Sequence, residues 1–311
     1  MNILVIGGCG YIGTVLCEKL FNQGYKVTIL DSQIFGNFLD KKKFNFIKKD
    51  IIEIQSIKLT NYNTIIHLAN IANDPSVELN PSISWEVNVL GTYLLVNKAI
   101  KDGVKKIIFS SSGSVYGVRK ERKVDENISP IPLSTYNKTK IIAERVLLSY
   151  SDKIKINCIR PATVCGYSKK MRLDLTVNSL VFQALKYKKI KVFGGAQIRP
   201  NIHIQDLTDI FIFFLKNNIP SGYFNAGFEN LTVMQIAEKV KSKINCKIDI
   251  KKIIDLRSYR LESSKLQRLG FKRKFTVDHA IDELISYNQS KQLNNDLRFH
   301  SINWLKKIGL K

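Results

Sequence analysis

The chain has 311 residues, of which 44% are hydrophobic and 10% aromatic, so the sequence excludes a disordered protein and supplies a sizeable core. No apolar run approaches the ~20 residues that span a bilayer, and the N-terminus resembles no secretion leader, so we expect no membrane insertion and a cytoplasmic protein. The 49 Lys and Arg exceed the 26 Asp and Glu, which gives a net charge of +23. This excess fits nucleic acid, an anionic substrate or a lysine-rich surface, and we favour the lysine-rich surface and expect no nucleic acid.

Strands and helices alternate through the first half of the chain. Short β-branched and apolar runs predict strands at residues 2–6, 26–30, 45–47, 64–68, 105–109 and 154–159. Helical spacing of apolar residues predicts helices from residue 12 to the stop at Gly24, and over 85–100 and 136–150. This alternation predicts an α/β fold with a Rossmann-like, doubly wound parallel sheet, whose ligands bind at the carboxyl ends of the strands.

The pattern changes after Pro161. Positively charged stretches without clear periodicity occupy residues 167–200 and 247–274, and between them we predict helices at 206–216 and 232–241 and a short strand at 223–225. We assign residues 1–165 to a Rossmann-like domain, which would bind a cofactor, and 166–311 mainly to a smaller substrate-binding lobe, and expect 201–228 to return to the first domain.

Three glycines connect the first strand to the first helix. Gly7, Gly10 and Gly13 form a G-x-x-G-x-x-G loop, in which glycine permits a tight turn and a close approach of backbone to a pyrophosphate. Asp31 ends the second strand, where its carboxylate can accept hydrogen bonds from the ribose hydroxyls of adenosine. Because that carboxylate would repel a 2′-phosphate, the loop predicts NAD as the cofactor.

The cysteines and histidines predict no metal site. The five cysteines contain no C-x-x-C pair, and we expect Cys9 and Cys165 to pack as small apolar residues. We expect His67 to form a hydrogen bond at the end of its strand. His203 and Asp206 precede and begin a predicted helix, so we expect them to cap it and close the lobe.

A serine, a tyrosine and a lysine form the candidate catalytic group. Ser112 follows the strand at 105–109, and Tyr136 and Lys140 are four residues apart on one face of a helix. A neighbouring cation favours the phenolate, so Tyr136 can take a proton from a substrate hydroxyl. Ser112 would hydrogen-bond the same oxygen, and Lys140 would also hold the nicotinamide ribose.

These motifs, in this order, resemble those of the extended short-chain dehydrogenase/reductases, and within them the NAD-dependent nucleotide-sugar epimerases and dehydratases. The resemblance extends over nearly the whole chain and includes the stretches 67–70, 88–92, 110–117 and 160–166. It implies a homodimer formed through the helices near 86–101 and 136–150. The cofactor-binding residues that the loop and the resemblance together predict are Gly7, Gly10, Tyr11, Ile12, Gly13, Asp31, Asp50, Ile51, Leu68, Ala69, Asn88, Ser110, Tyr136, Lys140 and Pro161.

The segments 171–178 and 197–206 resemble the part of these enzymes that grips the diphosphate of a nucleotide sugar. The resemblance implies that Asn178 bonds a phosphate oxygen and that Arg199 and Arg257 pair with the diphosphate, for which a planar guanidinium is suited. Ser112 and Thr163 complete the predicted substrate contacts, and the predicted partner is a nucleotide-diphosphate sugar.

The resemblance leaves more than one reaction open. Sugar 4,6-dehydratases carry an Asp-Glu pair after the catalytic Ser or Thr, whereas this chain has Gly113 and Ser114, which disfavours dehydration. We therefore expect an NAD-dependent epimerase that acts at C4 through a transient 4-keto sugar. The alternatives are a nucleotide-sugar 4-dehydrogenase or ketosugar reductase, and a non-catalytic NAD- or RNA-binding protein.

Overall fold

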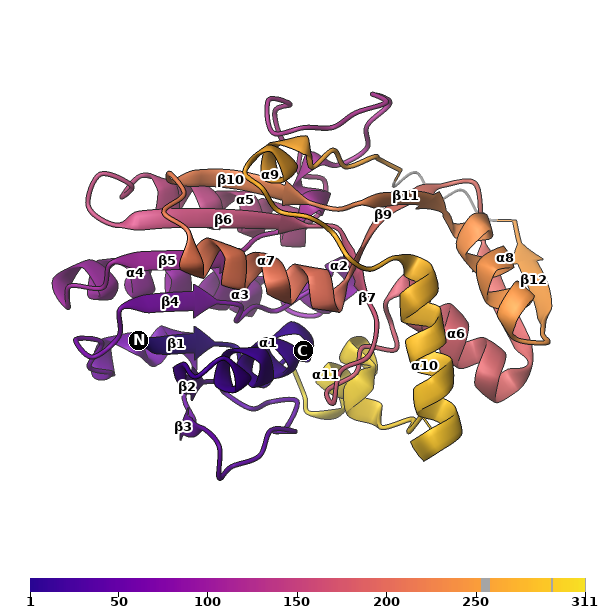
Figure 1. Ribbon diagram of the computed structural model, residues 1–311, viewed down its shortest axis with the longest axis horizontal. Coiled ribbons are helices and arrows are strands. Elements are labelled where there is room, and N and C mark those ends of the chain that lie inside the picture. Colours follow the sequence, from indigo (N-terminus) through magenta and orange to yellow (C-terminus); the bar gives the residue numbers. More distant parts are fainter. Residues whose placement is uncertain (253–257, 292, 311) are drawn as a thin grey trace.

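The computed structural model describes residues 1–252, 258–291 and 293–310, and its centre is a seven-stranded parallel sheet (Figure 1). The strand order is β10-β6-β5-β4-β1-β2-β3, which confirms the predicted doubly wound α/β fold. The strands of this sheet are β1 (Asn2–Ile6), β2 (Lys26–Leu30), β3 (Asn45–Ile47), β4 (Thr64–His67), β5 (Lys106–Ser110), β6 (Lys155–Pro161) and β10 (Gly222–Ala226).

The sheet is buried on both faces because helices cover each of them. Along β1, Ile3 and Val5 join one apolar cluster, whereas Leu4 and Ile6 join the other. Helices α1 (Tyr11–Asn22) and α7 (Ile204–Lys216) cover the first face, and α4 (Gly91–Lys101) and α5 (Thr135–Leu148) the second (Figure 1). The short helical elements on the way to α5 are η1 (Ile51–Ser56), α2 (Asp74–Val77), α3 (Pro81–Trp85), η2 (Glu86–Leu90) and η3 (Gly113–Tyr116).

The helix predicted over residues 85–100 is interrupted. The helical run begins earlier than predicted, with α3 at Pro81, and continues through η2, which is π-helical, into α4, which ends at Lys101. In this wider turn Asn88 faces the protein interior, where its amide accepts a hydrogen bond from the backbone N–H of Ile71 at 2.8 Å. The π-helical turn thus coincides with a hydrogen bond to a loop 17 residues earlier in the chain, which helical periodicity alone does not reveal.

The lobe is more regular than the sequence predicts. Residues 167–200, for which we predicted no element, contain a helix, a strand and the start of a second strand, and residues 277–291, also without a predicted element, form a long helix. The chain also returns to the first domain, because α7 packs on α1 and β10 pairs with β6. The elements of the lobe are α6 (Thr176–Tyr187), β8 (Lys189–Phe193), α8 (Val233–Lys243), β12 (Lys247–Lys251) and α10 (Val277–Lys291). Helix α9 (Ser264–Arg268) packs on β10 of the central sheet instead.

A small three-stranded sheet joins the two parts. Its strands, in the order β11-β9-β7, are β7 (Thr163–Cys165), β9 (Ile198–His203) and β11 (Glu229–Thr232). After the lobe, η4 (Leu297–Phe299) and α11 (Ser301–Lys307) return to the loop that follows β2, where the Trp304 indole N–H donates to the carbonyl of Ile34 at 2.6 Å.

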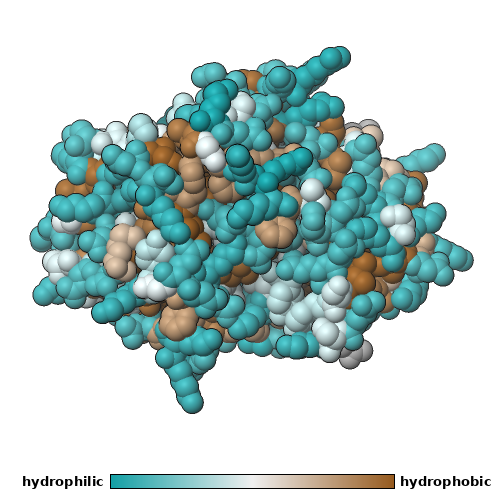
Figure 2. All heavy atoms as spheres, viewed as in Figure 1, coloured by the Kyte–Doolittle hydropathy of each residue, from teal (hydrophilic) through white to brown (hydrophobic). Residues whose placement is uncertain are grey.

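Hydrophilic side chains cover most of the face seen in Figure 2. Among the helices in the described part of the chain, none is long and apolar enough to cross a membrane. All five cysteines are buried with free thiols, and burial raises the pKa of Cys9 and Cys165 far above its usual range. Both cysteines therefore pack as small apolar residues, as predicted.

Candidate active site

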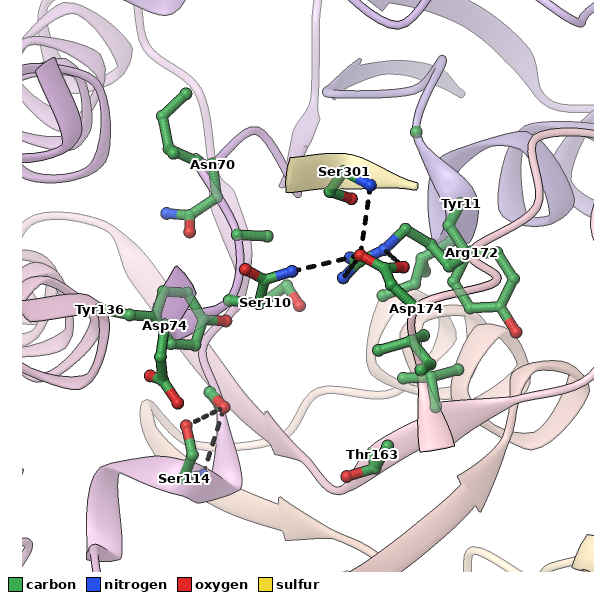
Figure 3. Close-up of a pocket in the computed structure, with 18 of the residues that line it drawn as sticks. Tyr11, Asn70, Asp74, Ser110, Ser114, Tyr136, Thr163, Arg172, Asp174 and Ser301 are labelled. Atoms are coloured by element: carbon green, nitrogen blue, oxygen red, sulfur yellow. Dashed lines mark hydrogen bonds and ion pairs between the residues drawn. The ribbon is translucent and has the colours of Figure 1, made fainter. Parts of the chain in front are cut away.

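A cavity of about 1160 Å³ opens at the carboxyl ends of the central strands and extends under the lobe. Loops after β1, β2, β4 and β5 form one side of it, and residues of β7, α6, β9 and α11 form the other. Figure 3 shows Tyr136, Asp74 and Ser114 on one side of the cavity and Arg172 and Asp174 on the other. This is the edge where a doubly wound sheet binds its ligands.

The glycine loop forms a cradle with no room for side chains. A Cβ on Gly7, whose φ is +83°, would lie 2.4 Å from the backbone nitrogen of Ala69, and one on Gly13 would lie 2.5 Å from the carbonyl oxygen of Gly7. Gly10 is the N-cap of α1 and has no side chain to satisfy the first N–H groups of the helix. Free N–H groups at a helix N-terminus fit a pyrophosphate, so the cradle suits NAD.

Asp31 lies beside this cradle at the end of β2. Its carboxylate accepts hydrogen bonds from the backbone N–H groups of Cys9 at 2.9 Å and Gln33 at 2.7 Å. Burial raises the pKa of Asp31, and these two hydrogen bonds oppose that rise. The carboxylate is thus oriented by the loops that follow β1 and β2.

Most of the predicted cofactor residues surround the same cavity. They come from the carboxyl ends of six parallel strands, β1 to β6, and from α5, which explains why residues so far apart in sequence meet here. Their contacts with the cofactor stay predictions. The predicted residues that line the cavity are Gly7, Gly10, Tyr11, Ile12, Gly13, Asp31, Asp50, Ile51, Leu68, Ala69, Ser110, Tyr136, Lys140 and Pro161.

Two predicted ligand contacts do not fit the geometry. Asn88 is 1% exposed and does not line the cavity, and its amide bonds the backbone of Ile71 and the hydroxyl of Thr139. Asn178 is fully buried, accepts from the N–H of Gly166, and donates to the Tyr11 hydroxyl at 3.0 Å. Both amides hold cavity walls in place, and the Asn178 amide has no donor left for a phosphate.

Ser112 and Tyr136 lie next to each other on one side of the cavity. The Ser112 hydroxyl oxygen accepts from the backbone N–H of Ser114 at 3.2 Å and lies 2.7 Å from the Ser114 hydroxyl. The Ser114 hydroxyl donates to Asn137 Oδ1 at 2.5 Å, so its proton is already used. A hydrogen bond with Ser112 lowers the pKa of Tyr136, although burial has the larger, opposite effect. The two hydroxyls can therefore bind one substrate oxygen together.

The protonation states of Tyr136 and Lys140 differ from the sequence prediction. Burial raises the pKa of Tyr136 to about 12, so the side chain is a neutral phenol in the cofactor-free site. Burial also lowers the pKa of Lys140 to about 7, and its ammonium donates to the Ser110 carbonyl at 2.6 Å. The cations near Tyr136 that favour the phenolate include Arg172. Lys140 lies one helical turn away and bonds the end of β5.

The predicted substrate residues are only partly brought together. Thr163 on β7 and Arg199 on β9 line the lobe side of the cavity, and Ser112, after β5, lines the opposite side. Arg257, predicted as a second phosphate ligand, lies outside the described residues.

The sequence analysis did not identify several residues of the cavity. Asp74 accepts from the Ser134 hydroxyl at 2.5 Å beside Tyr136, and Arg172 pairs with Asp174 at 2.6 Å opposite them (Figure 3). Both Arg172 and Asp174 lie in the segment 171–178 that we assigned to the substrate lobe. Their opposite charges, two residues apart, were the feature of the sequence from which this ion pair could have been predicted.

The histidines and the acid near the cavity are structural, as expected. His67 Nε2 lies 3.0 Å from the Thr92 hydroxyl, and burial lowers the pKa of His67 to about 3. His203 caps α7 by accepting from the N–H of Gln205, and Asp206 accepts two backbone N–H groups from residues 274–275. Among the described residues, no group of His, Cys, Asp and Glu side chains could hold a metal ion.

The fold, the glycine cradle and the serine–tyrosine pair are typical of an enzyme that uses a dinucleotide cofactor. The sequence profile of the "NAD dependent epimerase/dehydratase family" matches residues 3–227. The chain belongs to this family, whose cofactor is NAD.

The named relatives do not all share one activity. A "Putative UDP-glucose 4-epimerase" of Methanocaldococcus jannaschii is 28% identical in an alignment of 300 positions that covers 92% of this chain and 97% of that protein. "UDP-glucuronic acid decarboxylase 1" of Danio rerio is 26% identical in an alignment of 257 positions that covers 78% of this chain but only 60% of the relative. The crystal structure of a Thermotoga maritima UDP-glucose 4-epimerase with UDP-glucose superposes with a TM-score of 0.86 at 25% identity, covering 94% of this chain and 100% of that one.

Proposed function

We propose that this protein is an NAD-dependent nucleotide-sugar epimerase that inverts C4 through a transient 4-keto sugar. The observation that carries the proposal is the pairing of Ser112 and Tyr136 at the edge of a cavity that also holds the glycine cradle. At about 1160 Å³ the cavity exceeds the ~300–1,000 Å³ typical of a pocket for one small molecule, so it has room for a cofactor and a sugar nucleotide.

Each residue of the cavity has a separate role in the proposed reaction. NAD, when bound, supplies the hydride acceptor. Tyr136 acts as the phenolate: it takes the proton of the C4 hydroxyl and later returns it, while the Ser112 hydroxyl, turned from Ser114 toward the substrate, donates a hydrogen bond to the same oxygen. Arg172, on the opposite side of the cavity, favours the phenolate, and Lys140 lies one helical turn along α5 from Tyr136. Arg199 is suited to the diphosphate of the substrate.

The residues after Ser112 favour epimerisation over water elimination. Gly113 and Ser114 stand where the family's 4,6-dehydratases carry an acid and a base, and the Ser114 proton is held by Asn137. The full-length match to an archaeal protein named as a putative UDP-glucose 4-epimerase points the same way. The shorter match to decarboxylases makes decarboxylation of a uronic acid the reaction that most needs to be tested.

The purified protein should be incubated with UDP-, GDP-, CDP- and dTDP-linked hexoses and uronic acids. We expect one of these sugars to be converted into its C4 epimer with no net change in absorbance at the NADH band. Mass spectrometry and NMR of the products would identify the epimer. Stoichiometric release of NADH would instead establish a 4-dehydrogenase, and loss of CO₂ would establish a decarboxylase, so either result would contradict the proposal.

We also propose that the protein is a homodimer. Trp85, Leu90 and Tyr93 are 38%, 45% and 45% exposed and lie close together in the run formed by α3, η2 and α4. Large apolar side chains grouped on one helical surface are typical of an interface. Light scattering of the purified protein should give twice the mass of the 35.5 kDa chain, and a monomer at micromolar concentration would contradict this assembly.

A further inference from the structure

One lysine in the cavity has no partner in the protein. Lys170 lies in the loop between β7 and α6, lines the cavity, and is only 2% exposed. Among the described residues it forms no hydrogen bond or ion pair, and its ammonium contacts the Phe35 ring, 4.3 Å from the centroid. A buried ammonium without an anion is costly, so the position indicates a ligand that supplies negative charge.

The surroundings of Lys170 place it at the cofactor. Two residues earlier, the Ser168 hydroxyl donates to the carbonyl of Tyr11 at 2.9 Å, and the Tyr11 hydroxyl donates to the carbonyl of Gly166 at 2.7 Å. These bonds fix the lysine loop against the first residue of α1, where the glycine cradle presents its free N–H groups. Phe35 belongs to the loop after β2 that begins at Asp31.

Three carboxylates and one guanidinium lie near Lys170, and none of the carboxylates forms an ion pair with it in the described part of the chain. Asp31 lies after β2. Arg172 and Asp174 follow Lys170 in the loop between β7 and α6, and Asp296 precedes η4. Arg172 and Asp174 pair with each other at 2.6 Å, and Asp296 pairs with Arg298. Asp31 accepts its two backbone N–H groups, so each acid near Lys170 already has another partner.

We propose that Lys170 binds the diphosphate of NAD, where its ammonium joins the N-terminus of α1. This inference rests on the NAD binding of the family and not on the proposed epimerase reaction. The diphosphate of the sugar nucleotide is the other anion that the cavity would receive. It is less suited, because the contacts of the lysine loop are with α1 and the loop after β2.

The test is ligand binding to protein freed of cofactor, by calorimetry. Lys170→Met is expected to raise the Kd for NAD and for ADP-ribose by about tenfold or more, with much of the affinity restored in Lys170→Arg. Adenosine, which has no phosphate, and UDP should bind K170M as they bind the original protein. The matched control is Lys169→Met, because the neighbouring Lys169 is 48% exposed and pairs with Glu18 on the surface.

Measuring the proton uptake on NAD binding distinguishes a Lys170 that binds phosphate from a Lys170 that only packs in the protein. Burial, with Arg172 as a second cause, lowers the pKa of Lys170 to about 7, and a bound phosphate would raise it again. NAD binding at pH 8 should therefore take up part of a proton, seen as a dependence of the binding heat on the buffer, and K170M should abolish this uptake.

Three results would overturn the proposal. Equal NAD affinity in K170M and the original protein would remove the ligand role, and a loss of UDP affinity with NAD affinity retained would move the ammonium to the substrate. Tighter binding of NADP than of NAD would place the Lys170 ammonium at the 2′-hydroxyl of the adenosine ribose. Without cofactor, the melting temperature of K170M should equal or exceed that of the original protein, because the substitution removes a buried charge. Addition of NAD should raise the melting temperature of K170M less than it raises that of the original protein.

Discussion

Replacing Tyr136 by Phe is expected to lower kcat by about 10²–10⁴-fold, because the substitution removes the group that transfers the C4 proton. The ring still packs in the cavity, so NAD should stay bound and the KM for the sugar nucleotide should change little. Steady-state kinetics on the sugar found in the substrate screen, with the bound cofactor quantified after denaturation, would measure both effects.

A matched variant separates chemistry from folding in this experiment. Tyr187, at the end of α6, is 57% exposed and does not line the cavity, so Tyr187→Phe should keep full activity. If Y136F turned over at the original rate, proton transfer would have to be assigned to another group.

Replacing Glu144 by Ala is expected to lower the free energy of unfolding by about 3–5 kcal/mol. Arg160 is 1% exposed and donates to both carboxylate oxygens of Glu144, at 2.9 and 2.6 Å, and to the Tyr116 hydroxyl at 2.7 Å. Without Glu144 the guanidinium would remain buried with its charge unbalanced. Urea denaturation followed by circular dichroism would give the change.

A double-mutant cycle tests whether the pair or the packing is responsible. Replacing both residues by apolar ones, as Glu144→Leu with Arg160→Met, should cost less than the E144A substitution alone, because no charge remains buried. Arg145→Ala, at the exposed neighbouring position, should change the stability by no more than about 0.5 kcal/mol. Additive losses in the cycle would show that the two side chains do not depend on each other.

The sequence is most informative where function and local structure require the same residues. The glycine loop needs a particular backbone, and the β-branched runs are buried on both faces, so both can be recognised without tertiary information. Tyr136, Lys140 and Glu144 follow one another at intervals of four on α5, and this spacing places them on one face. The positions of Tyr136 and Ser112 at the sheet edge follow from the parallel topology.

What could not be predicted depends on contacts between distant segments. The amides of Asn88 and Asn178 could bind a ligand as well as the protein, and only the folded chain shows that backbone groups occupy them. The pKa of Tyr136 is raised because burial outweighs the nearby charges, which spacing on a helix cannot reveal. Lys170 is one of many lysines in the sequence, and only its burial sets it apart.

The π-helical turn η2 acts as a one-residue insertion in the helix that runs from α3 into α4. One residue corresponds to a rotation of about 100° around a helix axis. A chain one residue shorter here would continue as a regular α-helix but turn Asn88 away from Ile71, a residue that lines the cavity. The length of this segment is therefore constrained as tightly as its composition, and single-residue deletions should be tolerated far less here than in the surface loops.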